Sequence, residues 1–274
     1  MTLKLDGPLV LAGAGNMGGA MLQGWLERGL DPRSIVVQDP APPPAIMALL
    51  NQHGVTCTAT IASLPSPPAV ITVAVKPQLM DTVFPALAKL AAPGTVVLSI
   101  AAGRTIASFE TYLPPKTAVV RSIPNTPASI GRGITAAFAN AHVTAKQKAA
   151  CDALLAAVGE VGWLGDEALI DAATAVSGSG PAYVFLLAEC LAQAGVAAGL
   201  PVELAQRLAR ATVSGAGELL HRSGLPPSQL RKNVTSTGGT TAAALEVLMA
   251  ADGMQALFTR AVAAATARSR ALSS

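Results

Sequence analysis

The stretch Leu9–Ala20, LVLAGAGNMGGA, constrains the fold of this chain more than any other segment. Its apolar start, Leu9–Ala12, is typical of a buried strand, and glycines spaced as G-x-G-x-x-G follow directly and open a helix. This context predicts a tight turn at Gly13, close approach of backbone to a pyrophosphate at Gly15 and helix–strand packing at Gly18. A glycine-rich turn without a ligand is the alternative. We interpret the loop as a dinucleotide site made by Gly13, Ala14, Gly15, Asn16, Met17 and Gly18.

The first half of the chain alternates strand-like and helix-like segments. The run Val70–Val75, VITVAV, is rich in β-branched residues without alternation, as expected of a strand buried on both faces. Alternating strands and helices predict a mostly parallel, doubly wound sheet of the Rossmann type with helices on both faces. The expected strands are Leu9–Ala12, Ile35–Gln38, Val70–Val75, Val96–Ile100, Ala118–Ser122, Thr135–Phe138 and Val161–Leu164, and the expected helices are Asn16–Gly29, Pro42–Gln52, Pro77–Leu90 and Thr144–Val158.

From about Asp166 the expected strands stop and only helices follow. Their Ala, Gly, Val and Leu residues include few side chains large enough to enclose a private core, so we expect this half to pack against a second copy, in a homodimer or a higher homo-oligomer. We predict an α/β protein of two domains: a dinucleotide-binding Rossmann domain over residues 1–165 and an all-helical dimerisation and substrate domain over residues 166–274. The expected helical stretches are Asp166–Val176, Pro181–Ala198, Pro201–Ser223 and Thr241–Leu272, with smaller breaks inside.

Composition argues against several classes of protein. Hydrophobic residues make up 51% of the 274 residues and charged residues 13%, which excludes a disordered chain. The net charge is only +3 and the basic residues are scattered, which argues against a nucleic-acid partner. Cys57, Cys151 and Cys190 share no metal or disulfide spacing, so we expect a cytoplasmic location and no metal site. No apolar run approaches the roughly 18–20 residues that span a bilayer, so we expect no membrane association.

Asp39 ends the second expected strand, about twenty residues beyond the glycine loop. An acid at this place binds the hydroxyls of the adenosine ribose and repels a 2′-phosphate, which favours NADH over NADPH. The alternative is that Asp39 only starts a turn before Pro40. The choice between NADPH and NADH stays open.

Further polar loops follow the other expected strands, at the sheet edge where ligands bind. Lys76, in AVKPQ, follows a buried strand and is expected to lie on the cofactor side. SIAAG, Ser99–Gly103, ends the next strand in the same way. In RSIPNTPASIG, Asn125 and Thr126 stand between two prolines, in a rigid turn suited to presenting polar groups to a nicotinamide. A plain connection within the sheet is the alternative for that turn.

Two later segments place small hydroxyl residues and glycines directly before helices. Ser177 and Ser179 lie in SGSGPAYVF, with Pro181 in the first helical turn, and Val234–Leu245 reads VTSTGGTTAAAL. Helix amino termini with bare glycine amides bind anions, and carboxylates in particular. One serine before a helix is unremarkable, but two such helix starts indicate a substrate carboxylate bound at Gly239–Thr241.

Nearly the whole chain resembles pyrroline-5-carboxylate reductase, the last enzyme of proline synthesis. GAGNMG, AVKPQ, SIAAG, PNTPASIGRG, SGSGPAY, AGVAAGLP and VTSTGGTT follow the order and spacing of that family. The resemblance implies an amino-terminal dinucleotide domain, a helical domain that interlocks with a partner's, and an active site between them. It also implies an oxidoreductase that passes hydride from NADPH, or sometimes NADH, to the C=N carbon of L-1-pyrroline-5-carboxylate and forms L-proline.

The resemblance also implies roles for individual residues. The amides of Thr240 and Thr241 bind the substrate carboxylate, and the Thr241 hydroxyl is the catalytic group directed at the ring nitrogen. The family usually has proline where this chain has Thr237, and its loss is expected to loosen the loop slightly. The full predicted set is Ser177, Ser179, Gly239, Thr240 and Thr241 for the substrate, and Gly13, Ala14, Gly15, Asn16, Met17, Gly18, Asp39, Ala74, Val75, Lys76, Pro77, Ile100, Ala101, Ala102, Asn125 and Asn233 for the cofactor.

Two other functions fit parts of this pattern. Another imine reductase or a β-hydroxyacid oxidoreductase shares the two-domain plan, but a β-hydroxyacid enzyme is expected to carry a lysine acid in its helical domain. Lys232 is the only lysine there. A catalytically silent nucleotide-sensing module would bind cofactor without turnover, and the intact Gly239–Thr241 segment argues against it.

Overall fold

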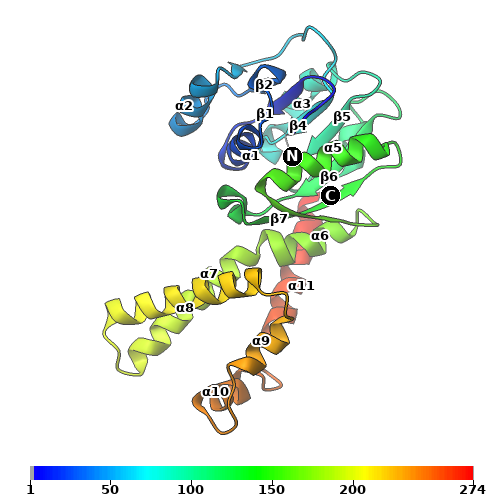
Figure 1. The fold of residues 1–274 in the computed structure, drawn as a ribbon. Coiled ribbons are helices and arrows are strands. Elements are labelled where there is room, and N and C mark those ends of the chain that lie inside the picture. The colour runs from blue at the N-terminus through cyan, green and yellow to red at the C-terminus, as the bar shows by residue number, and fades with distance from the viewer. Residues whose placement is uncertain (1–2, 274) are drawn as a thin grey trace. The chain divides into compact units, whose positions relative to one another are not determined.

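The computed structural model describes residues 3–273 of the chain, and they form two compact units (Figure 1). The first unit comprises Met1–Gly178 together with Ala265–Ser274, and the second comprises Ser179–Ala264. The last helix therefore begins in the second unit and ends in the first.

The first unit is built on an eight-stranded sheet in the order β3-β2-β1-β4-β5-β6-β7-β8. The pairs from β3 to β6 are parallel, β7 pairs antiparallel with β6, and β8 pairs parallel with β7. The prediction of a mostly parallel, doubly wound sheet is confirmed. The strands are β1 Leu9–Ala12, β2 Ile35–Gln38, β3 Thr56–Thr58, β4 Val70–Val73, β5 Val96–Ser99, β6 Ala118–Ile123, β7 Gly133–Ala139 and β8 Gly159–Trp163.

Helices cover both faces of this sheet (Figure 1). On one face Trp25 is fully buried, and its indole N–H donates to the carbonyl oxygen of Leu154 at 2.9 Å. On the other face the rings of Phe84 and Phe109 meet edge to face, with centroids 4.9 Å apart. These aromatic contacts fix helices against the two apolar faces of the strands. The helices are α1 Asn16–Glu27, α2 Pro44–His53, α3 Met80–Ala88, α4 Ile106–Glu110, α5 Ala145–Leu155 and α6 Leu169–Ala173, and a π-helical turn, Thr174–Gly178, follows α6.

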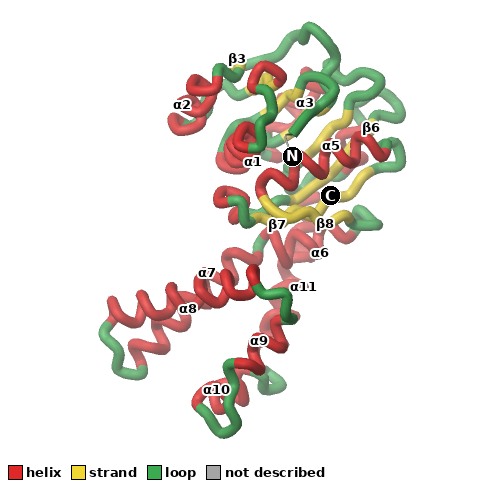
Figure 2. Tube along the Cα trace, viewed as in Figure 1, coloured by secondary structure: helices red, strands yellow, loops and turns green. Residues whose placement is uncertain are grey.

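The second unit is helical (Figure 2). Its first two helices pack side by side, yet the first has no buried residue among those described and the second has only Ala205 and Ala209. Large apolar side chains are exposed instead, with Phe185 63% and Leu186 57% accessible. The unit therefore lacks an apolar core of its own, as its small residues predict. The helices are α7 Gly180–Ala197, α8 Val202–Arg222, α9 Pro227–Asn233, α10 Thr240–Leu248 and α11 Met254–Ser273.

Three short elements were not predicted. Strand β3 is three residues long, α4 has five residues, and α9 has seven residues and begins at Pro227 after another proline. Elements of this length show too little hydrophobic periodicity to be recognised, and a Pro-Pro pair is typical of a turn or loop between elements. The helix expected to begin at Asp166 starts instead at Leu169 and passes into the π-helical turn.

Within residues 3–273, one helical stretch, Leu169–Ala197, is long and apolar enough to cross a membrane, with a mean hydropathy of 1.3. The prediction that no such stretch exists is wrong by this measure, because the interspersed Gly, Ser and Thr residues lower the mean hydropathy only slightly. A single helix of this kind is weak evidence for a membrane span. A helix that is apolar all round is equally suited to burial against other protein.

Candidate functional site

The glycine loop after β1 has the geometry that its spacing predicts. Gly13 has a φ of 90°, and a Cβ there would lie 2.7 Å from the Ala74 carbonyl oxygen. A Cβ on Gly18 would overlap the Gly13 carbonyl oxygen, so helix α1 reaches this strand only because that side chain is absent. Nothing lies within 4 Å of a Cβ built on Gly15, whose backbone is exposed at the uncapped start of α1. This open backbone cradle at a helix amino terminus fits a dinucleotide pyrophosphate.

Sheet register brings two further predicted loops beside the glycine loop. Ala12, Val73 and Ser99 are aligned across β1, β4 and β5, so the next residue of each strand enters a loop at the same carboxyl edge. The Ala74 amide donates to Ala12 at 2.7 Å, and the Ile100 amide donates to Val73 at 3.0 Å. The strand order changes direction at β1, which has β2 on one side and β4 on the other. Ligands bind in folds of this kind at such a switch point. The predicted residues assembled there are Ala74, Val75, Lys76, Pro77, Ile100, Ala101 and Ala102.

Arg104, which was not predicted, ties two of these loops together. Its guanidinium donates to the Pro77 carbonyl oxygen at 2.9 Å and to both carboxylate oxygens of Asp81, at 3.0 and 2.8 Å. The hydrogen bond from Arg104 lowers the pKa of Asp81, and the hydrogen bond to Asp81 raises the pKa of Tyr112. A cavity of about 510 Å³ adjoins this clamp and is lined in part by Gly103 and Leu272. The sequence signal was a single basic residue directly after SIAAG.

Asp39 lies at the end of β2, beside the glycine loop. Its carboxylate accepts hydrogen bonds from the amides of Ala14, at 2.7 Å, and Ala41, at 2.9 Å. Burial, and then the charge of Asp39, raise the pKa of the Cys57 thiol. The Asp39 carboxylate therefore starts a turn, as the alternative hypothesis predicted. It also faces the glycine loop, as a role in binding the ribose would require.

Asn125 connects the loop after β6 to the π-helical turn. Its Nδ2 donates to the Ser177 carbonyl oxygen at 3.1 Å, and its Oδ1 accepts from the Ile134 amide at 2.9 Å. The Ser177 hydroxyl donates to the Ala173 carbonyl oxygen at 2.9 Å. Asn125 is buried, so this amide fixes the position of the backbone at Ser177. A contact between Asn125 and a nicotinamide stays a prediction.

The other predicted substrate residues belong to the second unit. Ser236–Gly239 forms a turn closed by the Gly239 amide and the Ser236 carbonyl oxygen at 3.1 Å, with Gly238 at a φ of 69°. Gly239 is the N-cap of α10 and supplies no side-chain cap, so Thr240 and Thr241 begin the helix with bare amides. The Ser236 hydroxyl occupies the space that a Cβ on Gly239 would need, which sequence reasoning did not single out.

Two predicted residues of the second unit lie outside that loop. Ser179 precedes α7 without capping it. Asn233 ends α9, and its Oδ1 accepts from Gln229 at 2.8 Å. Both predicted contacts with ligands stay predictions.

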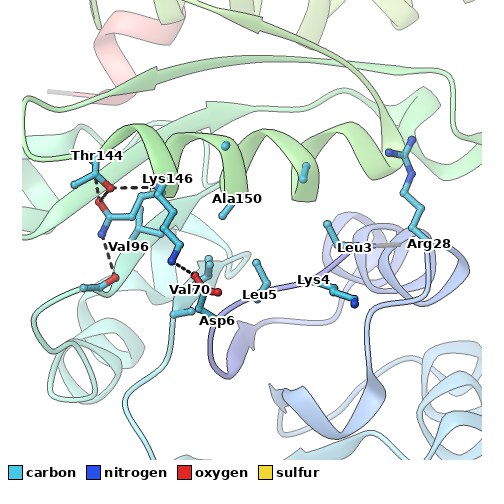
Figure 3. Close-up of a pocket in the computed structure, with 15 residues that line it drawn as sticks. Leu3, Lys4, Leu5, Asp6, Arg28, Val70, Val96, Thr144, Lys146 and Ala150 are labelled. Carbon is cyan, nitrogen blue, oxygen red and sulfur yellow. Dashed lines mark hydrogen bonds and ion pairs between the residues drawn. The ribbon is translucent and has the colours of Figure 1, made fainter. Parts of the chain in front are cut away.

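A separate cavity of about 850 Å³ lies at the opposite edge of the sheet (Figure 3). It is lined by residues before or at the start of β1, β4 and β5, including Leu5, Val70 and Val96, and by one face of α5. Lys146 of α5 pairs with Asp6 across it at 2.6 Å. Its place at the amino ends of the strands separates it from the glycine loop, so it is no part of the dinucleotide site.

Comparison with known proteins matches both parts of the chain. Residues 167–272 match the family model for pyrroline-5-carboxylate reductase dimerisation, and residues 9–103 match the model for coenzyme F420-dependent NADP oxidoreductases. The structure is similar to that of a pyrroline-5-carboxylate reductase from Coxiella burnetii, with a TM-score of 0.91 and 34% identity over 98% of this chain and 100% of that one. It is also similar to the Plasmodium falciparum enzyme with NADP bound, with a TM-score of 0.79 and 28% identity over 98% and 99% of the two chains.

Curated relatives agree with the structures. The pyrroline-5-carboxylate reductase of Pseudomonas aeruginosa is 40% identical over 264 residues, which cover 96% of both chains. The Pisum sativum enzyme is 35% identical over 261 residues, 95% of this chain and 94% of that one. With the glycine loop, the switch-point loops and the bare helix start on α10 in place, these matches show that the chain belongs to the pyrroline-5-carboxylate reductase family.

Proposed function

We propose that this chain reduces the C=N bond of L-1-pyrroline-5-carboxylate to give L-proline, with NAD(P)H as reductant, in proline biosynthesis. Membership of the family and the match to an NADP oxidoreductase model support this activity. The structural feature that supports this activity most directly is the start of α10. There a glycine turn leaves two threonine amides uncapped at a helix amino terminus.

The α10 start is suited to the carboxylate of the substrate. Backbone amides and the helix dipole together favour an anion at this place. Gly238 takes a φ of 69° that other residues rarely adopt, and so turns the chain to expose the amides of Thr240 and Thr241. We assign the substrate carboxylate to these amides and to Gly239, with Ser177 and Ser179 as further substrate residues.

The Thr241 hydroxyl is assigned to the ring nitrogen. Bound NAD(P)H supplies the hydride for the C=N carbon. A ring imine is basic enough to be partly protonated beforehand, so a hydroxyl that donates a hydrogen bond to the nitrogen is a sufficient partner and no strong acid is needed. The rest of the protein's contribution is to position the substrate and exclude water.

The cofactor is assigned to the switch-point loops of the first unit. The Gly13–Gly18 loop holds the pyrophosphate through the amides from Gly15 onward, because the Gly13 and Ala14 amides already donate to Gln38 and Asp39. The loops that begin at Ala74 and Ile100 flank the nicotinamide half. Asn125 and Asn233 complete the assignment. The open space at Gly15 and the exposed start of α1 support it.

The family match supports an oligomer, and we propose specifically a homodimer whose helical domains interlock. The apolar residues left exposed on α7 support this arrangement, because a soluble monomer rarely exposes so large an apolar surface. Phe185→Glu should then convert the dimer to a monomer in sedimentation velocity. Met47→Glu, which changes an exposed residue of α2, should leave the dimer intact. A Phe185→Glu protein that remains dimeric would contradict the proposed interface.

We propose a cytoplasmic location on the use of cysteine. Cys57, Cys151 and Cys190 are all free thiols. Burial, followed by the charge of Asp152, raises the pKa of Cys151 to about 12, so this thiol is unreactive at neutral pH.

The test of the activity is oxidation of NAD(P)H that depends on pyrroline-5-carboxylate. Thr241→Ala should lower kcat at least tenfold while the Kd of the nicotinamide nucleotide stays unchanged. Thr241→Ser, which keeps the hydroxyl, should restore most of the rate, and Thr240→Ala should change little because only the Thr240 amide is assigned a role. Cofactor binding without turnover in the unmodified protein would favour a nucleotide-sensing module instead.

A further inference from the structure

The carboxylate of Asp39 is held in one orientation at the edge of the glycine loop. Oδ2 accepts from the Ala14 amide at 2.7 Å, and Oδ1 accepts from the Ala41 amide at 2.9 Å. The preceding residue, Gln38, is fixed as well, since its carbonyl oxygen accepts from the Gly13 amide at 2.9 Å. The end of β2 and the glycine loop therefore form one rigid unit around a carboxylate.

Two hydrogen bonds leave this carboxylate with acceptor capacity to spare, because an ionised carboxylate has about four lone-pair sites. Asp39 is only half-buried, so a ligand is able to reach the free sites. The two neighbouring hydroxyls of an adenosine ribose are matching donors, and an acid at the end of the second strand of this fold binds them. A 2′-phosphate would instead bring a charge of about −1.5 to −2 against a fixed negative group.

The chain from the start of β2 to the end of β4 carries no lysine or arginine to offset that repulsion. From Ser34 to Val75, a segment that contains β2, α2, β3 and β4, the sequence has no Lys or Arg. The nearest basic residue before it, Arg33, pairs with Asp31 at 2.9 Å at the other end of β2. The β2–α2 loop carries prolines where an NADPH-binding protein would place an arginine.

We propose that this protein prefers NADH to NADPH, with Asp39 as the residue that determines the preference. The inference rests on the proposed function for its physiological meaning, but the preference itself is a property of binding. NADH is expected to bind at least tenfold more tightly than NADPH. The chain would then differ from its Plasmodium falciparum neighbour, whose structure holds NADP.

The experiment measures Kd for NADH and NADPH by nicotinamide fluorescence, with the full-length protein and without substrate. Asp39→Asn removes the charge and should lower the NADH:NADPH preference at least threefold. Ala41→Arg adds a cation on an exposed side chain and keeps the backbone amide that binds Asp39, so it should lower the preference further. Asp31→Asn removes an equivalent charge at the far end of β2 and should leave the preference unchanged.

Tighter binding of NADPH by the unmodified protein would overturn the proposal. So would an unchanged preference in both Asp39→Asn and Ala41→Arg, and if Asp39→Asn fails to fold, Ala41→Arg alone decides. Failure of the proposed function has a different signature: NADH preference in binding, with no oxidation when pyrroline-5-carboxylate is added.

Discussion

Asn125 holds Ser177 through a side-chain amide whose two polar atoms both bond to backbone: Nδ2 to the Ser177 carbonyl oxygen at 3.1 Å and Oδ1 to the Ile134 amide at 2.9 Å. The π-helical turn that carries Ser177 is thereby fixed to the loop after β6. Interruptions of this kind in helices are frequent at functional sites. The pair gives Asn125 a positioning role that is independent of any contact with a nicotinamide.

Asn125→Ala is expected to lower the free energy of unfolding by about 1–3 kcal/mol, because it removes two hydrogen bonds to part-buried backbone groups. It should also lower kcat, since Ser177 is released. Asn140→Ala is the matched control: Asn140 likewise bridges backbone groups, at Val119 and Thr117, away from Ser177. Urea denaturation and steady-state kinetics check both. Equal losses of kcat in the two variants would contradict the hypothesis that Asn125 positions Ser177.

Gly15→Val should abolish dinucleotide binding without unfolding the protein. The space around a Cβ at Gly15 is empty and its φ of −69° suits other residues, so the substitution fits the protein itself. Only a ligand whose pyrophosphate approaches this backbone would collide with the new side chain. Gly162→Val on β8, also in open space, is the control and should bind cofactor normally. Unchanged affinity in Gly15→Val would place the pyrophosphate elsewhere.

The geometry at the three glycines was predictable because it depends on a short local pattern. A Cβ would collide with neighbouring backbone at Gly13 and Gly18 and would lie in open space at Gly15, as the spacing predicts. The loops after β4 and β5 were predictable for a similar reason, since parallel strands end at one edge. The local sequence was sufficient wherever chain direction and spacing alone decide the geometry.

The ties made by Arg104 and Asn125 were not predictable, because their partners are distant in sequence. Arg104 bonds to Pro77 and Asp81, and Asn125 bonds to Ser177, only once the sheet has brought their segments together. Neither residue belongs to a local pattern that names its partner. Such long-range polar contacts follow from tertiary structure and leave no periodic signal in the chain.

Arg104→Lys is expected to raise the KM for the nicotinamide nucleotide about two- to fivefold, with little change in kcat or stability. A lysine cannot bond at once to the Pro77 carbonyl oxygen and to both oxygens of Asp81, so the loops after β4 and β5 loosen. The pair is partly exposed, so its contribution to stability is small. Tyr112→Phe is the control, because it removes one hydrogen bond to Asp81 without touching either loop. An unchanged KM in Arg104→Lys would contradict the clamp.

Acid should loosen the same clamp. The Arg104 hydrogen bond lowers the pKa of Asp81, so the stabilisation is present above the ordinary carboxylate pKa of about 3.9 and is lost as pH falls through the lower folded-state value. The Kd of the cofactor, measured by fluorescence from pH 7 downward, should therefore rise more steeply below about pH 4 in the unmodified protein than in Arg104→Lys. Parallel curves would show that Asp81 is not coupled to the site.

Thr72→Val should stabilise the protein by about 1 kcal/mol. Thr72 is fully buried on β4, the central strand beside β1, and within the described residues its hydroxyl has no hydrogen-bond partner. Valine has nearly the same shape and removes the unsatisfied group. The control is Thr95→Val: the Thr95 hydroxyl donates to the Pro68 carbonyl oxygen at 2.7 Å, so its removal should destabilise. Denaturation midpoints that move in opposite directions in the two variants would support this account. A lower midpoint in both variants would contradict it.

Thr237→Pro should tighten the loop before α10. Thr237 is the second residue of the turn Ser236–Gly239, and the positive φ of Gly238 at the third position is typical of a type II turn, whose second position favours proline. Among the described residues the Thr237 amide donates no hydrogen bond, so proline removes no bond there. We expect a gain of about 0.4–1 kcal/mol in the free energy of unfolding and a lower KM for pyrroline-5-carboxylate.

The matched control for this change is Thr235→Pro, two residues earlier. The Thr235 amide donates to the Lys232 carbonyl oxygen at 3.0 Å, so proline there removes a hydrogen bond and should destabilise the loop and raise the KM. Thermal denaturation and steady-state kinetics on the two variants separate the effects. If Thr237→Pro also weakens substrate binding, the loop needs the freedom that threonine allows, and the backbone of this turn must change when the carboxylate binds.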